Sequence, residues 1–112
     1  MSAHRAVMEL SAQSGVRGAV VALRDGVVVD GIVHVDVRAD VLAAFGSAVL
    51  ERARDVARSV LRAEPRCVVI DAEAGRLCLA DSRDMIVVLL ADRHAPIGRL
   101  RLAVRDAVGA LT

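Results

Sequence analysis

The sequence predicts an α+β fold in which helices flank one five-stranded antiparallel sheet. Valine-rich segments of strand length occur as one pair and one group of three, and short turns rich in glycine and aspartate separate them. Three other segments carry apolar residues at helical spacing, which gives the order α-β-β-α-β-β-β-α. One sheet flanked by helices is the simplest arrangement that buries all of these apolar faces.

The chain is expected to begin with a short helix and a β-hairpin. Residues 4–13 have the apolar spacing of an amphipathic helix. Strands are expected at residues 17–24 and 27–34, because both are rich in valine and an Asp25-Gly26 pair lies between them. Such a pair favours a type I′ turn, in which both central residues have positive φ.

A long helix is expected over residues 38–63, with Asp36 or Asp40 as its cap and Pro65 just beyond its end. At about 100° per residue, apolar side chains gather on one side: Leu42, Phe45, Val49, Ala53, Val56 and Val60. This apolar arc is wider than one sheet face requires, which predicts a second neighbour. The residues that widen it are Leu50, Ala57 and Leu61.

Residues 66–73 and 76–82 are expected to pair as a second hairpin around an Ala74-Gly75 turn. This register brings opposite charges together and apolar residues together. The pairs are Glu73 with Arg76, Ile70 with Leu79, Cys67 with Ser82, and Cys78 with Asp71. The two cysteines then share a face without being neighbours, so a disulfide between them would require distortion.

The end of the chain is expected to form a central strand and a last helix. Residues 85–91 are the most apolar segment, as a strand buried on both faces should be. Pro96 suits the first turn of a helix, and apolar residues at helical spacing follow it.

Composition argues against several functional classes. The length of 112 residues favours a single domain, residues 1–112. A net charge of +1 and a single aromatic residue offer neither the basic field nor the stacking surface of a nucleic-acid-binding protein. The longest apolar run, residues 85–91, is far too short to span a membrane, and no targeting segment precedes it. We therefore expect a cytoplasmic protein whose Cys67 and Cys78 stay reduced.

No residue pattern predicts catalysis, a metal site or a cofactor site. Three histidines lack the spacing of metal ligands: His4, His34 and His94. The glycines form no phosphate-binding loop, and no serine lies in a nucleophile motif. Asp71 and Glu73 share a strand face, but an exposed strand end explains them without acid–base chemistry.

The charged face of the long helix is the candidate partner-binding surface. Its residues are Glu51, Arg54, Asp55, Arg58 and Arg62. Arg52 lies at the rim of the apolar arc, where arginines often border interfaces. Charge pairs at helical spacing also explain a solvated face, which is the favoured alternative.

Three segments resemble the Roadblock/dynein light chain family, and together they cover nearly the whole chain. GVRGAVVALRDGVVVDG at 15–31 is similar to the family's first strand, turn and return strand. RCVVIDAEAGRLCLADSRDMIVVLLAD at 66–92 is similar to its three-stranded meander, and IGRLRLAVRDAV at 97–108 to its last helix. The resemblance implies the sheet order 2-1-5-4-3, with the long helix on one face and the two terminal helices on the other.

The resemblance also implies a homodimer, in which the third strand pairs with its copy and the long helices pack nearby. The residues favour the same arrangement, since an apolar edge strand and a surplus apolar helix face both need cover. The expected interface residues are Arg66, Cys67, Val68, Val69, Ile70, Leu50, Ala57 and Leu61.

For function, the resemblance implies a non-catalytic regulator or scaffold of a small Ras-like GTPase, similar to bacterial MglB-like proteins that act on MglA-type GTPases. Such regulators order the GTPase's own residues, so no arginine is expected to act as a finger. The chain ends at Thr112, and the C-terminal extension of some of these regulators is not expected. The alternatives are a small-molecule sensor and a general dimerisation adaptor in a signalling complex; an enzyme ranks last.

Overall fold

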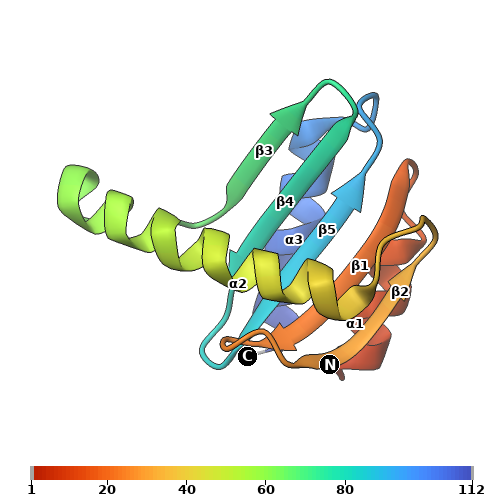
Figure 1. Cartoon of the computed structure of the whole chain (residues 1–112), viewed down its shortest axis with the longest axis horizontal. Helices are drawn as coiled ribbons and strands as arrows, with labels where there is room; N and C mark the ends of the chain where they lie inside the picture. The colour runs from red at the N-terminus through yellow and green to blue at the C-terminus, as the bar shows by residue number, and fades with distance from the viewer. Residues whose placement is uncertain (1, 112) are drawn as a thin grey trace.

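The computed structural model describes residues 2–111 and contains an antiparallel sheet with helices on both faces (Figure 1). Met1 and Thr112, the predicted domain boundaries, lie outside the described residues. The predicted fold class and order of elements are confirmed. In chain order the elements are α1 (Ala3–Ser11), β1 (Val16–Leu23), β2 (Val28–Val33), α2 (Ala39–Val56), η1 (Ala57–Leu61), β3 (Val68–Ala72), β4 (Gly75–Asp81), β5 (Met85–Ala91) and α3 (Ile97–Leu111).

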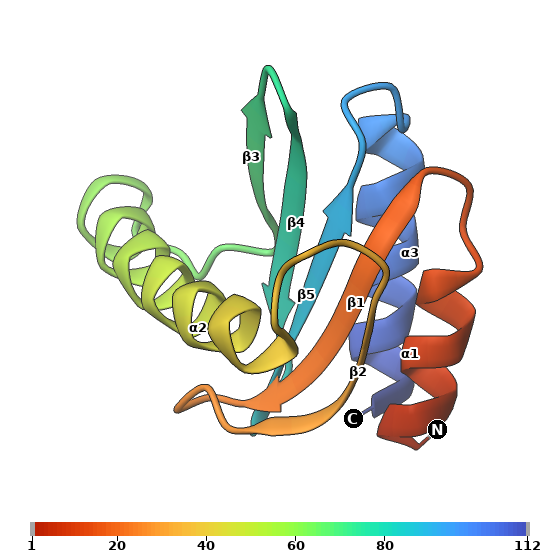
Figure 2. The same ribbon diagram turned by 45° about the vertical axis from the view of Figure 1, so that its right-hand side comes forward.

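The sheet has the strand order β2-β1-β5-β4-β3, and every neighbouring pair is antiparallel. Helix α2 crosses one face, while α1 and α3 lie side by side on the other (Figure 2). Both the strand order and the placement of the helices agree with the prediction. Strand β5 is central, and its residues from Ile86 to Leu89 are fully buried.

The sheet separates two apolar cores. One lies under α1 and α3 and includes Val7, Val87 and Val104; the other lies under α2 and includes Leu50 and Val88. No charged or polar side chain is buried among residues 2–111. Although the interior is apolar, no helix in this range has the length and hydropathy needed to cross a bilayer.

The first hairpin has a longer turn than the predicted type I′ turn. The Gly26 N–H donates to the Leu23 carbonyl at 2.9 Å, and the Leu23 N–H donates to the Val27 carbonyl at 2.8 Å. Gly26 has a φ of 94°, whereas Asp25 keeps a negative φ. A three-residue loop that ends in such a glycine is a common alternative to the two-residue turn. The Asp25 side chain stabilises it by accepting the Val27 N–H at 3.1 Å.

The second hairpin is shifted by two residues from the predicted register. Glu73 and Ala74 form the turn, so the predicted Ala74-Gly75 turn is wrong. A two-residue shift keeps every side chain on its own face of the sheet, and it still places a carboxylate opposite Arg76. Apolar pattern and charge therefore do not distinguish the two registers. The observed pairs are Asp71 with Arg76, Ile70 with Leu77, Val69 with Cys78, and Val68 with Leu79.

The long helix begins without either of the predicted caps. Arg38 is the N-cap residue and makes no side-chain capping bond, while Asp40 lies in the first turn. A carboxylate there still favours the helix, because it lies near the positive end of the helix dipole. Beyond Val56 the helix continues as the π-helical turn η1 and ends at Arg62, which has a φ of 54°.

Candidate docking surface

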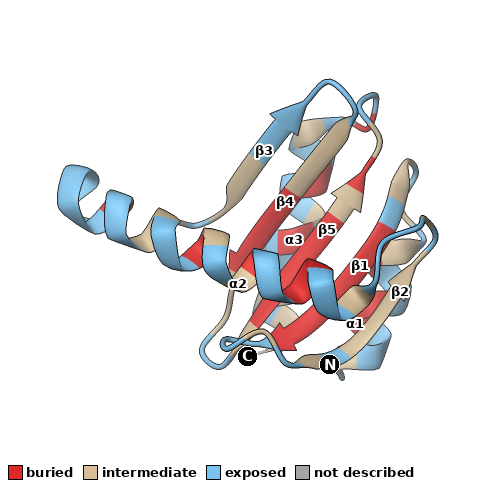
Figure 3. Ribbon diagram, in the orientation of Figure 1, coloured by how far each residue is buried: buried red, intermediate tan, exposed pale blue. Residues whose placement is uncertain are grey.

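The long helix reaches beyond the sheet that it covers. In Figures 1 and 2, α2 crosses the sheet and η1 extends past the β3 edge. Figure 3 shows that the far end of the helix is mostly exposed, and the main contacts of η1 are with α2 itself. The buried residues of α2 are Leu42, Ala43, Gly46 and Leu50.

Exposed apolar side chains follow one flank of this helix. Phe45 is 68 % exposed, Val56 61 % and Val60 72 %, and Val49 lies half-buried between them. Their spacing of four, seven and four residues puts them on one side of a helix. A row of large exposed apolar side chains marks a contact surface. The α2 apolar stripe comprises these four residues and Leu61, which is 73 % exposed at the end of η1.

The structure rotates the helix relative to the predicted orientation. Phe45, Val56 and Val60 were expected on the same side as Leu42, yet they are exposed. Conversely, Leu50 and Ala57 were expected at a dimer interface, but they are buried within the protein at 1 % and 6 % exposure and contribute little surface. Because the helix is apolar over a wide arc, hydrophobic spacing does not determine which part of the arc meets the sheet. Among the three predicted helix interface residues, Leu61 is the exposed one.

Strand β3 is an open edge of the sheet. It pairs only with β4, so its other side has no strand partner within residues 2–111. Such an edge is a ready template for another strand. Arg66 and Ile70 are exposed, while the rest of the predicted interface segment is half-buried: Cys67, Val68 and Val69. These five residues lie on or beside the edge, as the predicted strand pairing requires.

The charged residues predicted for partner binding divide into two groups. Arg54 is only 12 % exposed, and its Nη1 lies 2.5 Å from Asp81 Oδ2, which Arg24 also approaches at 2.8 Å. Arg54 thereby fastens α2 to the end of β4. Arg58 pairs with Glu64 at 2.5 Å. The remaining four are exposed and make no ion pair within residues 2–111: Glu51, Arg52, Asp55 and Arg62.

The Arg58–Glu64 pair joins η1 to the loop that follows it. The hydrogen bond from Arg58, aided by its charge, lowers the pKa of Glu64, and the same hydrogen bond raises the pKa of Arg58. Both side chains are exposed, so solvent screens the attraction. This pair therefore shapes the end of the helix without linking it to the core.

Cys67 and Cys78 lie side by side, contrary to the prediction. Their sulfur atoms are 3.2 Å apart. The observed register explains this, because Cys78 pairs with Val69, the next residue along the same face from Cys67. Cys78 is buried and Cys67 is half-buried, and both face the core under α1 and α3. If the predicted turn is placed at Glu73-Ala74, the sequence alone indicates that the two cysteines are close.

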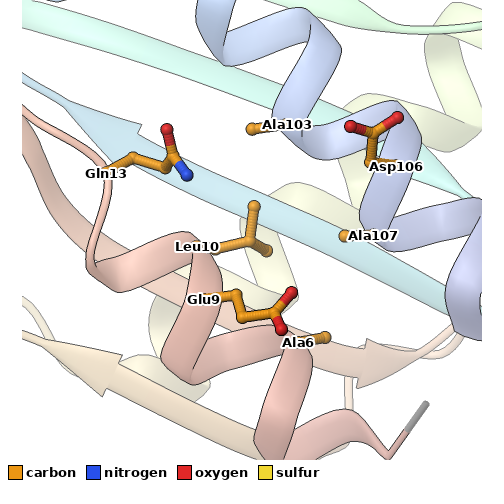
Figure 4. A pocket seen from close by; sticks show the side chains of 7 residues that line it. All are labelled: Ala6, Glu9, Leu10, Gln13, Ala103, Asp106 and Ala107. Carbon is orange, nitrogen blue, oxygen red and sulfur yellow. The ribbon is translucent and has the colours of Figure 1, made fainter.

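A small groove lies between α1 and α3 (Figure 4). Its volume is ≈ 130 Å³, whereas small-molecule sites usually have volumes of about 300–1,000 Å³. This groove is therefore smaller than a usual small-molecule site. Within residues 2–111, no three His, Cys, Asp or Glu side chains cluster as metal ligands do. The lining residues are Ala6, Glu9, Leu10, Gln13, Ala103, Asp106 and Ala107.

Comparison with known proteins relates this fold to a family. The family model for the Roadblock/LC7 domain matches residues 4–91. An uncharacterized protein of Methanocaldococcus jannaschii is 26% identical over 103 residues, which cover 92% of this chain and 90% of that protein.

Two solved structures share the fold. A Roadblock/LC7 domain from Streptomyces avermitilis has a TM-score of 0.86 and 20% identity, covering 96% of this chain and 92% of its own. The gliding protein MglB from Thermus thermophilus has a TM-score of 0.83 and 23% identity, covering 97% of this chain and 84% of its own. At these identities the similarity establishes a common fold.

Proposed function

Because this chain belongs to the Roadblock/LC7 domain family, we propose that residues 1–112 form one Roadblock-type domain that regulates or scaffolds a small Ras-like GTPase as a homodimer. The protein acts by contact with its partner and not by catalysis. The observation that carries the proposal is the α2 apolar stripe, which lies exposed on a helix that extends past the open β3 edge.

A second copy of the chain covers both the α2 apolar stripe and the open β3 edge. Antiparallel pairing of β3 with its copy, across a two-fold axis, gives each edge strand its missing partner. The same axis brings the overhanging end of each long helix toward the other protomer. The side chains of Val60 and Leu61 are then buried in the interface. Burial of apolar surface stabilises the dimer by roughly 25 cal/mol per Å².

The GTPase contact uses the exposed charges of α2. Glu51, Arg52 and Asp55 are free of ion pairs within the described chain and are available to a partner. Contact at this surface biases the switch segments of a GTPase toward one state. The fold shared with MglB and the sequence resemblance to MglB-like regulators of MglA-type GTPases support this class of partner. Arg54 and Arg58 already hold Asp81 and Glu64, and neither is assigned the role of a finger.

The Val60→Arg variant tests the dimer. Light scattering of the unaltered protein should give about twice the chain mass of 11.8 kDa. Val60 is 72 % exposed, so the substitution should leave the folded protomer intact. It should weaken self-association roughly tenfold or more, because an arginine buried at the interface lacks a partner charge. Met8→Arg, on α1, is the matched control, and a monomeric unaltered protein at micromolar concentration would refute the dimer.

A pull-down from lysate of the native host tests the partner, with GDP in one arm and a non-hydrolysable GTP analogue in the other. Recovery of a Ras-like GTPase with one nucleotide supports a regulator, and recovery with both supports a scaffold. Recovery of the GTPase should fall with the double variant Arg52→Glu/Asp55→Arg, which reverses both charges. Light scattering should show that this variant is still a dimer. If no GTPase is recovered in either arm while the dimer is intact, the proposed class of partner is wrong, and the alternatives are another protein partner or a small ligand.

A further inference from the structure

Cys67 and Cys78 form a thiol site between the edge strand and its neighbour. Their sulfur atoms are 3.2 Å apart, compared with about 2.05 Å in a disulfide. Cys67 precedes Val68, the first paired residue of β3, so strand pairing does not fix its backbone. A small movement of Cys67 is therefore enough to bring the two sulfur atoms within bonding distance.

Several groups favour negative charge on the Cys67 sulfur. The Cys78 thiol donates a hydrogen bond to it, Arg101 of α3 supplies positive charge, and the Leu79 N–H donates a second bond. Against the opposing effect of burial, these contacts lower the pKa of Cys67 to about 7. The hydrogen bond to Cys67 and burial both raise the pKa of Cys78. Above the pKa of Cys67 the pair thus holds one thiolate and one thiol, and the thiolate is the reactive nucleophile.

We propose that Cys67 and Cys78 are a reversible redox site that fastens the edge strand β3 to β4. The oxidant is a peroxide. The Cys67 thiolate attacks one oxygen of hydrogen peroxide, the O–O bond breaks, and hydroxide leaves, which forms a sulfenic acid on Cys67. The Cys78 sulfur then attacks the Cys67 sulfur, the S–O bond breaks, and water leaves with the Cys78 proton. Two electrons pass from the thiols to the peroxide, and a dithiol reverses the reaction by thiol–disulfide exchange.

The disulfide acts on β3 because this strand has fewer neighbours than the other edge strand. It pairs with β4 alone, whereas β2 pairs with β1 and also packs against α1 and α2. Arg76 of β4 adds one side-chain contact to this strand, a hydrogen bond to Asp71 at 3.0 Å. A covalent link between Cys67 and Cys78 closes a loop that contains all of β3, the turn and the first half of β4, and it restricts the unfolded chain. Oxidation therefore stabilises the edge strand, whichever partner meets that edge.

The test compares the purified chain after hydrogen peroxide with the chain kept in dithiothreitol. Mass spectrometry of the oxidised chain should show the loss of two hydrogen atoms and one peptide pair that joins Cys67 to Cys78. The thermal midpoint should rise by roughly 5–10 °C, and amide exchange over β3 should slow. Dithiothreitol should reverse all three changes.

Cys67→Ser and Cys78→Ser are the matched controls, and neither should gain thermal stability on oxidation. A sulfinic acid on Cys67 beside an unreacted Cys78, or a disulfide between two chains, would overturn the site. An internal disulfide that leaves the midpoint and the β3 exchange unchanged would overturn its fastening role. The Cys67–Cys78 peptide pair and its mass do not depend on self-association or on a GTPase, so this readout is independent of the proposed function. The thermal midpoint and the β3 exchange are compared at protein concentrations low enough for the chain to be monomeric, since self-association would change both.

Alkylation kinetics test the thiolate step. The rate of reaction of Cys67 with iodoacetamide should have its midpoint near pH 7, where the pKa lies. Cys78→Ala removes the hydrogen-bond donor and should move this midpoint upward. Cys78→Ser keeps a hydroxyl donor and should move it less. If the Ala variant leaves the midpoint unchanged, Cys78 does not activate Cys67.

Discussion

The long helix has two parts with different surroundings. Residues 39–50 lie across the sheet, where their inward-facing side chains are buried. Beyond Leu50, the apolar side chains of Val56, Val60 and Leu61 are more than half exposed. The helix is longer than the sheet is wide, so η1 extends past the β3 edge and its exposed side chains have no sheet to pack against.

The same kind of side chain therefore has a different role in each part. At Gly46, a Cβ atom would lie 2.5 Å from Val88 Cγ2, so the first part is packed against the sheet with no spare room. The second part ends in a π-helical turn, a conformation that is frequent at functional sites. An inward-facing apolar residue of the first part, such as Leu50, stabilises the protomer, whereas an exposed one of the second part, such as Leu61, is available for association.

The largest expected effect is a difference in the free energy of unfolding between two variants, one with a substitution in each part of the helix. Leu50→Ala should lower the free energy of unfolding by about 2–5 kcal/mol, because it leaves a cavity under the helix. Leu61→Ala, at a position 73 % exposed, should change it by only about 0.5 kcal/mol or less. Urea denaturation measures both values.

The urea denaturation should be carried out at protein concentrations low enough for the chain to be monomeric, because self-association would stabilise the folded state by mass action. Equal losses for Leu50→Ala and Leu61→Ala would contradict the division of the helix. A Leu61→Ala loss that appears only at high protein concentration would instead place Leu61 in an interface.

An intermediate effect is expected where the two parts meet, at the link between Arg54 and Asp81. Asp81→Asn removes the charge that holds both Arg54 and Arg24. We expect a loss of about 1–3 kcal/mol in the free energy of unfolding, because Arg54 is left partly buried without a counter-charge. Asp84→Asn, in the exposed turn nearby, is the control and should have almost no effect. A loss of similar size in both variants would show that Asp81 does not anchor the helix.

Much of the fold is predictable from the sequence because local signals agree with one another. Valine-rich segments, the glycines between them and the apolar spacing of the helices define the order of elements. The resemblance supplies the strand order, which local pattern does not determine. The rotation of the long helix escapes prediction, because Phe45 and Leu50 are both apolar and only the sheet decides which is buried.

The thiol site escapes prediction for a related reason. Its existence depends on hairpin register, and two registers satisfy the same apolar and charge pattern. With the turn at Ala74-Gly75, Cys67 and Cys78 are separated along the strands. With the turn at Glu73-Ala74, they come within 3.2 Å of each other. A difference of two residues therefore decides whether the chain has a redox site.

The smallest expected effect lies at the far end of the overhanging part, in the Arg58–Glu64 pair. Arg58 lowers the pKa of Glu64 below its ordinary value of 4.5. The ionised carboxylate therefore stabilises the folded state above that ordinary value, and this contribution is lost as the pH falls through the lowered pKa. Glu64→Gln removes the charge, so its thermal midpoint should lie slightly below that of the unaltered protein at neutral pH and should converge with it in acid. Added salt should also shrink the difference, because the pair is exposed. If the difference between the two thermal midpoints persists in acid, the charge of Glu64 is not its cause. Packing of the Glu64 side chain would then stabilise the end of the helix.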